Sequence, residues 1–339
     1  MDKPQEEMQF LGLLGIYKET IKTIVSWRKI FTQITLTFIL PLAFIFLAHM
    51  EVSNIISRKI IHTDFQKHIT RPGTLRYNKL SDALRSEWIT YWLLKATYFT
   101  FLIVFSLLST SAVVYTTASI YTTRNYNLTF TTVTSIVPKV WKRLVVTFLC
   151  AFVVFFVYNM LAILILVFYM VHFPDNTFGV VVFHVMLVLY FVGFAYMSII
   201  WQMACVVSVL ESCYGVRAMM KSMDLIKGKR WVAIIVVSKL VLSFFAMQIV
   251  FEVFVVNGGE LGVGVWRRLG FGVLCLVVVL MLFLFGLVVQ TILYLVCKSY
   301  HHENIDKSSL ADFLENYLGD YEALNGDDNV QVQLEQANV

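Results

Sequence analysis

Residues 204–231 read ACVVSVLESCYGVRAMMKSMDLIKGKRW and connect one long apolar run to the next. Gly215 interrupts the helical pattern, and apolar side chains then recur at helical spacing with Arg217 and Lys221 on the opposite side. These apolar side chains are Val216, Met219, Met220, Met223 and Ile226. Gly228 supplies a helix stop, so the stretch predicts a short helix at a membrane surface between two spans.

The basic residues of this stretch are candidates for binding lipid headgroups, because positive charge at a membrane surface attracts anionic lipid. They are Arg217, Lys221, Lys227, Lys229 and Arg230. Trp231 follows and adds a ring that favours the membrane–water interface. In the alternative interpretation this is a tight loop whose basic residues only anchor the helix ends.

The composition is that of a membrane protein. Of 339 residues, 58% are hydrophobic and 14% are charged, and the mean hydropathy is +0.73. Six apolar runs are long enough to cross about 30 Å of hydrocarbon. They lie at about 30–49, 93–117, 144–171, 179–210, 231–256 and 268–297. Because backbone groups in lipid must be hydrogen-bonded within each span, the predicted fold is an all-α polytopic bundle of six transmembrane helices.

The distribution of basic residues predicts that both termini are cytosolic. With the amino terminus inside, 16 Lys and Arg residues lie on the cytosolic side and nine on the other. The predicted organisation is a cytosolic amphipathic segment at 1–29, a six-span domain at 30–297 and a cytosolic tail at 298–339. The expected location is the endoplasmic reticulum, another endomembrane or the plasma membrane.

The six spans are interpreted as three helical hairpins, each preceded by an amphipathic interfacial segment. Such segments end at Trp27-Arg28-Lys29, at Trp141-Lys142-Arg143 and at Lys229-Arg230-Trp231. The alternative is that tryptophan and basic residues mark cytosolic helix ends without any internal repeat. Pro41 in the first span predicts a kink, and the outer loop 50–92 has room for a small ordered element.

The carboxyl-terminal tail is acidic. Residues 299–339 carry nine Asp or Glu residues against one Lys, whereas residues 1–298 hold 26 basic and 13 acidic residues. A short helix is predicted at about 309–318. This charge disfavours binding to anionic lipid or nucleic acid, so the tail is a candidate site for a protein partner.

Several polar side chains fall at similar depth when each span is measured at about 1.5 Å per residue. This candidate polar layer contains Lys239, Gln202, Gln290, Glu211, Ser109 and Ser111. One interpretation is a cavity that binds a small or lipid-like anion, with Lys239 as the counter-charge. The other is that these side chains act as glue, which means that they form hydrogen bonds between helices. In that case the long Lys239 side chain extends toward the cytosol and keeps its ammonium group in water.

No sequence motif indicates catalysis. The chain has no nucleophile motif, no HExxH, no P-loop and no Gly-rich dinucleotide fingerprint. No catalytic residue, cofactor or metal ligand is therefore predicted.

The chain resembles a family of plant six-span membrane proteins of unknown function, some of which are labelled as polyadenylate-binding-protein partners. The resemblance rests on FSLLSTSAVVYT at 105–116, VPKVWKRL at 137–144, LGDY at 318–321 and a set of single positions. These positions are Glu211, Gly215, Ala218, Lys221, Ser222, Leu225, Lys227 and Gly228. The same core is similar to the membrane domain of bacterial glycerophosphodiester phosphodiesterases, which implies an accessory role near lipids.

The leading functional hypothesis is a non-enzymatic protein that organises or senses the bilayer, as an accessory in lipid homeostasis. Its expected partners are anionic membrane lipids and a protein bound by the tail. One alternative is a transporter or binder of a small or lipid-like anion around Lys239. Another is a lipid enzyme embedded in the membrane.

Overall fold

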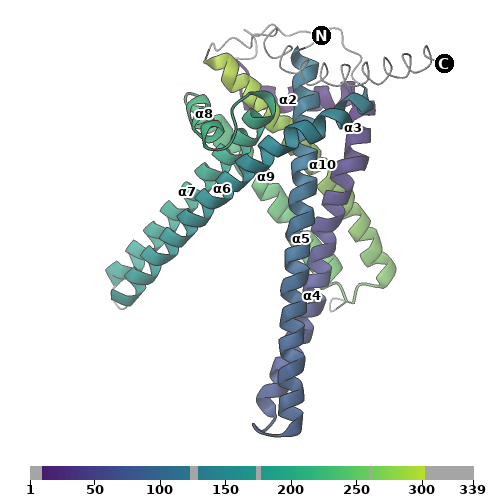
Figure 1. Cartoon of the computed structure of the whole chain (residues 1–339), viewed down its shortest axis with the longest axis vertical. Helices are drawn as coiled ribbons and strands as arrows, with labels where there is room; N and C mark the ends of the chain where they lie inside the picture. The colour runs from purple at the N-terminus through teal and green to yellow at the C-terminus, as the bar shows by residue number, and fades with distance from the viewer. Residues whose placement is uncertain (1–9, 123–128, 173–176, 260–261, 302–339) are drawn as a thin grey trace, which may run out of the picture. The chain divides into compact units, whose positions relative to one another are not determined.

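The structure is a computed structural model that describes residues 10–122, 129–172, 177–259 and 262–301 (Figure 1). Across these ranges every regular element is a helix. The elements are α2 (Leu13–Ser26), α3 (Arg28–Ile34), the π-helix η1 (Thr35–Ile39), α4 (Leu40–Ile69), α5 (Leu75–Thr122), α6 (Phe130–His172), α7 (Thr177–Leu210), α8 (Val216–Ile226), α9 (Arg230–Phe251), the π-helix η2 (Glu252–Val256) and α10 (Val265–Tyr300).

Six helical segments are long and apolar enough to cross a membrane, which confirms the six predicted spans. They are Arg28–Ile69, Leu75–Tyr121, Phe130–His172, Gly179–Leu210, Arg230–Val256 and Val265–Tyr300. Arg28–Ile69 and Leu75–Tyr121 extend furthest beyond their apolar runs, because polar residues of the predicted loop 50–92 continue these two helices.

The chain divides into two compact units. The first contains residues 1–32, 110–240 and 285–339, and the second contains 33–109 and 241–284. The long helices α5, α9 and α10 contribute residues to both. Each unit is described by itself below.

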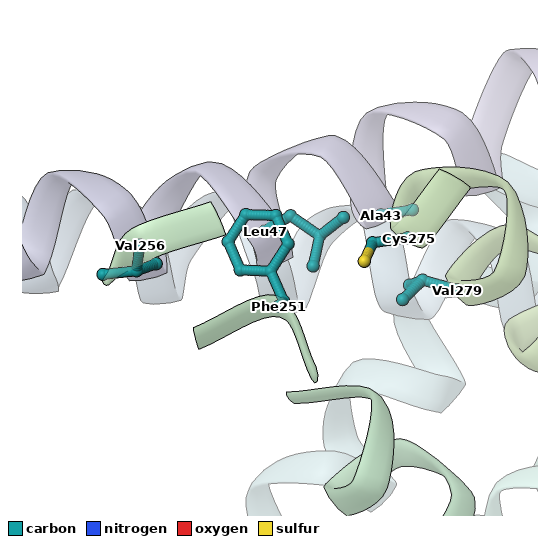
Figure 2. Packing of buried hydrophobic residues seen from close by; sticks show 6 residues of the cluster. All are labelled: Ala43, Leu47, Phe251, Val256, Cys275 and Val279. Atoms are coloured by element: carbon teal, nitrogen blue, oxygen red, sulfur yellow. The ribbon is translucent and has the colours of Figure 1, made fainter. Parts of the chain in front are cut away.

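The second unit is built around a small apolar core (Figure 2). Its fully buried members come from α4, α9, η2 and α10. They are Ala43, Leu47, Phe251, Val256, Cys275 and Val279. At the start of this unit η1 precedes Pro41, which has no N–H to donate to the helical ladder, so the break in regular α-helix falls where the kink was predicted.

The predicted outer loop 50–92 is mostly helical. Helix α4 continues to Ile69 and α5 begins at Leu75, so only residues 70–74 connect them. Lys59 pairs with Glu87 at 3.4 Å between the two helices. Hydropathy locates a span by its apolar run, and it cannot detect the polar helical turns beyond that run.

In the first unit α6 and α7 lie side by side (Figure 1). The Tyr158 hydroxyl donates to the Tyr190 carbonyl at 2.9 Å, and the Tyr190 hydroxyl donates to Asn159 Oδ1 at 2.7 Å. The segment expected as a separate surface helix before Trp141 is the first part of α6. Its apolar face is buried at Val133, Ile136, Val137 and Val140.

Helix α2 packs through a face that contains two threonines. Ile16, Thr20 and Thr23 are buried, and Thr23 Oγ1 lies 2.7 Å from the Tyr121 hydroxyl. The apolar side chains of the other face are exposed at Leu14, Ile21 and Val25.

Two predictions concern residues outside the described ranges. The helix expected at 309–318 and the acidic part of the tail lie in residues 302–339, and the first nine residues of the amino-terminal segment lie outside as well.

Replacing Phe251 by alanine should destabilise the second unit. The side chain is 5% exposed and packs in the core, whereas Phe245 on the same helix is 58% exposed. In lipid, the substitution removes packing contacts and leaves a cavity. We therefore expect Phe251→Ala to lower the free energy of unfolding by about 2 kcal/mol. Thermal denaturation of purified protein in mild detergent measures it, and Phe245→Ala is the matched control. Equal losses in the two variants would contradict this core.

Candidate functional site

The turn between α7 and α8 is fixed by Gly215. Its φ of 66° lies in the left-handed region that glycine adopts without strain. Its N–H donates to Thr147 Oγ1 on α6 at 2.8 Å, and that oxygen also lies 2.7 Å from Ser208 Oγ on α7. The turn is therefore hydrogen-bonded to two neighbouring helices, which sets where α8 begins.

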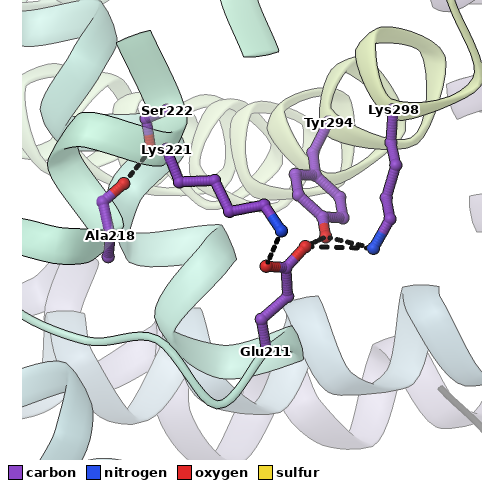
Figure 3. Close-up of polar contacts among 6 residues, drawn as sticks. All are labelled: Glu211, Ala218, Lys221, Ser222, Tyr294 and Lys298. Carbon is purple, nitrogen blue, oxygen red and sulfur yellow. Dashed lines mark hydrogen bonds and ion pairs between the residues drawn. The ribbon is translucent and has the colours of Figure 1, made fainter. Parts of the chain in front are cut away.

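The buried face of α8 includes two small side chains besides Met219, Leu225 and Ile226. Ala218 and Ser222 are fully buried, and Ser222 Oγ donates to the Ala218 carbonyl at 2.7 Å. Small residues allow close approach of the helix backbones. Figure 3 shows that Lys221, on the same helix, extends toward Glu211.

Glu211 lies at the centre of a polar cluster that joins α8 to α10 (Figure 3). Its Oε2 is 2.6 Å from Lys221 Nζ. Its Oε1 accepts hydrogen bonds from the Tyr294 hydroxyl at 2.6 Å and from Lys298 Nζ at 3.0 Å. We call Glu211, Lys221, Tyr294 and Lys298 the Glu211 cluster. It fixes three elements of the first unit relative to one another.

The electrostatics of the cluster keep the carboxylate ionised. Burial of Glu211 acts to raise its pKa, but hydrogen bonds from Lys221 and Tyr294 and the charge of Lys298 outweigh burial and lower it. The side chains of Glu211 and Lys298 are only 11% and 14% exposed. Two ammonium groups on one carboxylate give the cluster a formal charge of +1.

A polar cavity of about 520 Å³ lies beside the cluster. Its lining comprises Lys221, Asp224, Leu225, Lys227 and His301. Lys227 Nζ is 2.6 Å from Asp224 Oδ1, and this hydrogen bond lowers the pKa of the fully exposed Asp224 carboxyl. The cavity is therefore open to solvent and has a surplus of basic groups.

The residues of the candidate polar layer have different surroundings in the structure. Gln290 Nε2 donates to Gln202 Oε1 at 2.8 Å, which joins α10 to α7 as the glue interpretation expects. Lys239 Nζ lies 5.8 Å from the centre of the Tyr17 ring on α2. Ser111 is buried in the first unit, and Ser109 is buried in the second.

Glu211, the acidic member of the candidate polar layer, is contacted by Lys221, Tyr294 and Lys298. Tyr294 and Lys298 were not among the site residues predicted from the sequence. The sequence did contain a signal for this pair. Tyr294 and Lys298 are four residues apart, so they share one face of α10.

The predicted headgroup-binding residues differ in exposure. Arg217, Lys227 and Arg230 are exposed, and Lys229 is half-buried with its Nζ 5.3 Å from the centre of the Tyr300 ring. Lys221 belongs to the Glu211 cluster.

Removing the Glu211 charge should destabilise the first unit. Glu211→Gln leaves the ammonium groups of Lys221 and Lys298 without their counter-charge, and we expect a loss of about 3 kcal/mol. Thermal denaturation in detergent measures it. Asp224→Asn is the control, because the pair of Asp224 with Lys227 is exposed to solvent and contributes little to stability. The cluster has no structural role if the two variants unfold at the same temperature.

The lowered pKa of Glu211 predicts how stability responds to acid. Its contribution is complete above the ordinary value of 4.5 and is lost as pH falls through the lowered value. Between about pH 7 and about pH 3 the wild type should therefore lose more stability than Glu211→Gln, which has no carboxyl group to protonate. Thermal denaturation midpoints of the wild type and of Glu211→Gln across this pH range measure the difference. Equal decreases in the two proteins would contradict the prediction.

Comparison of the chain with curated proteins and with solved structures gives no significant match. One protein-family model matches residues 1–337, which is nearly the whole chain. The chain therefore belongs to the family described as Domain of unknown function (DUF8558).

Proposed function

We propose that this protein is a non-enzymatic membrane protein that organises or senses the bilayer by binding anionic lipid headgroups at its cytosolic face. In this proposal the six spans form three hairpins, both termini are cytosolic, and α2 and α8 lie in the plane of the membrane surface. The compartment is an endomembrane or the plasma membrane, and the role is accessory to lipid homeostasis.

The exposed face of α8 is the observation that carries this proposal. Val216, Met220 and Met223 are exposed at helical spacing while the opposite face of α8 is buried. Arg217 lies beside this stripe and is exposed. An apolar stripe with flanking basic residues is what a helix in the membrane interface presents to lipid.

Two further features support a membrane-surface location for this face. Trp231 is 79% exposed at the start of α9, next to the exposed Arg230. On α2 the side chains of Leu14, Ile21 and Val25 are exposed, and the threonine-containing face is buried against the protein. An exposed tryptophan beside an arginine and an exposed apolar helix face are common where a protein meets the membrane interface, which supports the proposal.

The alternatives have less support. The Gln202–Gln290 hydrogen bond is the contact expected of helix glue, so it does not favour an anion pathway around Lys239. The resemblance to plant six-span proteins and to a phosphodiesterase membrane domain agrees with a role near lipids and assigns no reaction.

The test removes exposed positive charge without disturbing the Glu211 cluster. Neutralising Arg217, Lys227 and Arg230 together by glutamine should weaken retention of phosphatidylserine, because each basic residue near a surface contributes about 1 kcal/mol. Three such residues correspond to a loss of about 100-fold in affinity. Native mass spectrometry of the full chain, titrated with phosphatidylserine and phosphatidylcholine, measures the change.

The matched control neutralises three exposed basic residues in the second unit, Arg71, Arg76 and Lys79. It should retain phosphatidylserine as the wild type does. Equal loss in the two triple variants, or full retention in the first, would overturn the proposal.

A further inference from the structure

The second unit contains an apolar groove of about 450 Å³ between α4, α9 with η2, and α10. This volume lies within the range of small-molecule sites. Its walls include Phe44, Leu47, Phe251, Val255, Leu269 and Val273. Gly272 also lines the groove and leaves that part of the wall without a side chain.

One end of the groove is charged. Arg268 Nη2 is 3.3 Å from Glu51 Oε1, and Arg268 Nε donates to the Val255 carbonyl at 2.8 Å. That carbonyl belongs to η2, at a helix end where carbonyl groups have no partner within the helix. The guanidinium is therefore held in place by two contacts, and it has further N–H donors.

The second oxygen of Glu51 is buried and accepts no hydrogen bond from any residue that the structure describes. Leaving such an acceptor unsatisfied costs about 1–3 kcal/mol. Glu51 lines the groove and its side chain is 34% exposed, so this carboxylate is the group that a donor in the groove would meet.

The position of the charged end agrees with a lipid in the groove. By hydropathy the first span ends near residue 49 and the sixth begins near residue 268, so Glu51 and Arg268 fall at the edge of the predicted hydrocarbon region. Lipid headgroups lie at that depth, and the apolar groove continues from there among residues of the spans.

We propose that this groove binds one acyl chain of a zwitterionic phospholipid whose headgroup carries a primary ammonium group. The ammonium group donates to the Glu51 carboxylate, and the phosphate accepts from Arg268. The pair has no net charge, which matches a zwitterion. A choline headgroup has no N–H and cannot satisfy Glu51, so the site distinguishes two phospholipids that differ only in methyl groups.

The experiment titrates the full chain in mild detergent with phosphatidylethanolamine and phosphatidylcholine of identical acyl chains, and native mass spectrometry measures each affinity. The wild type should bind phosphatidylethanolamine about tenfold more tightly, as expected for a charge-assisted hydrogen bond. Glu51→Gln removes the charge at nearly constant shape and should abolish this preference.

A second variant tests the groove independently of its charged end. A Cβ at Gly272 would have only Val255 Cγ1 near it, at 4.0 Å, so Gly272→Leu fits the helix and fills the groove. It should weaken binding of both lipids. Thermal denaturation of each variant verifies that it is folded.

Each result decides the proposal. Equal affinity of the wild type for the two lipids, a preference that persists in Glu51→Gln, or unchanged binding in Gly272→Leu would each overturn it. Stronger binding of phosphatidylglycerol than of phosphatidylethanolamine would mean that the donor is a hydroxyl group and that the ammonium assignment is wrong. If no lipid is retained, the groove holds water only. The basic residues near α8 play no part here, so this outcome leaves the function proposed above intact.

Discussion

The ionised carboxylate of Glu211 is the group on which the arrangement of α7, α8 and α10 depends. It follows the end of α7 and receives bonds from Lys221 on α8 and from Tyr294 and Lys298 on α10. A carboxylate with so little exposure stays ionised only because its partners compensate for lost hydration. The glycine turn at Gly215 makes this possible, since it reverses the chain soon after Glu211 and lets α8 bring Lys221 back to it.

The lipid environment explains why polar contacts hold the first unit together. Long stretches of α6 and α7 expose apolar side chains such as Phe152, Leu164 and Val188. In water such a surface would drive association, but in lipid it is already solvated. Helix pairing must then come from close packing and hydrogen bonds, as in the contacts of Thr147 with Ser208 and of Gln202 with Gln290.

Hydropathy was sufficient to locate the six spans, because crossing lipid requires an apolar run in each. It could not find the polar turns of α4 and α5 beyond those runs. It also placed Glu211, Gln202, Gln290 and Lys239 at similar depth, but depth along a helix does not specify which way a side chain points. The Gln202–Gln290 bond was within reach of that reasoning, whereas pairing Glu211 with Lys298, 87 residues away, required knowing which faces of α7 and α10 meet.

Glu211 and Glu51 differ in how completely their carboxylate oxygens are hydrogen-bonded, and the binding role that we propose for Glu51 rests on that difference. Both oxygens of Glu211 have partners within the protein. Glu51 has Arg268 on one oxygen, while its other oxygen has no partner among the described residues, and the Glu51 side chain lines an apolar groove. A satisfied carboxylate stabilises the fold and gains nothing from a ligand. An unsatisfied one raises the free energy of the empty protein, so a ligand that supplies the missing donor gains that energy on binding.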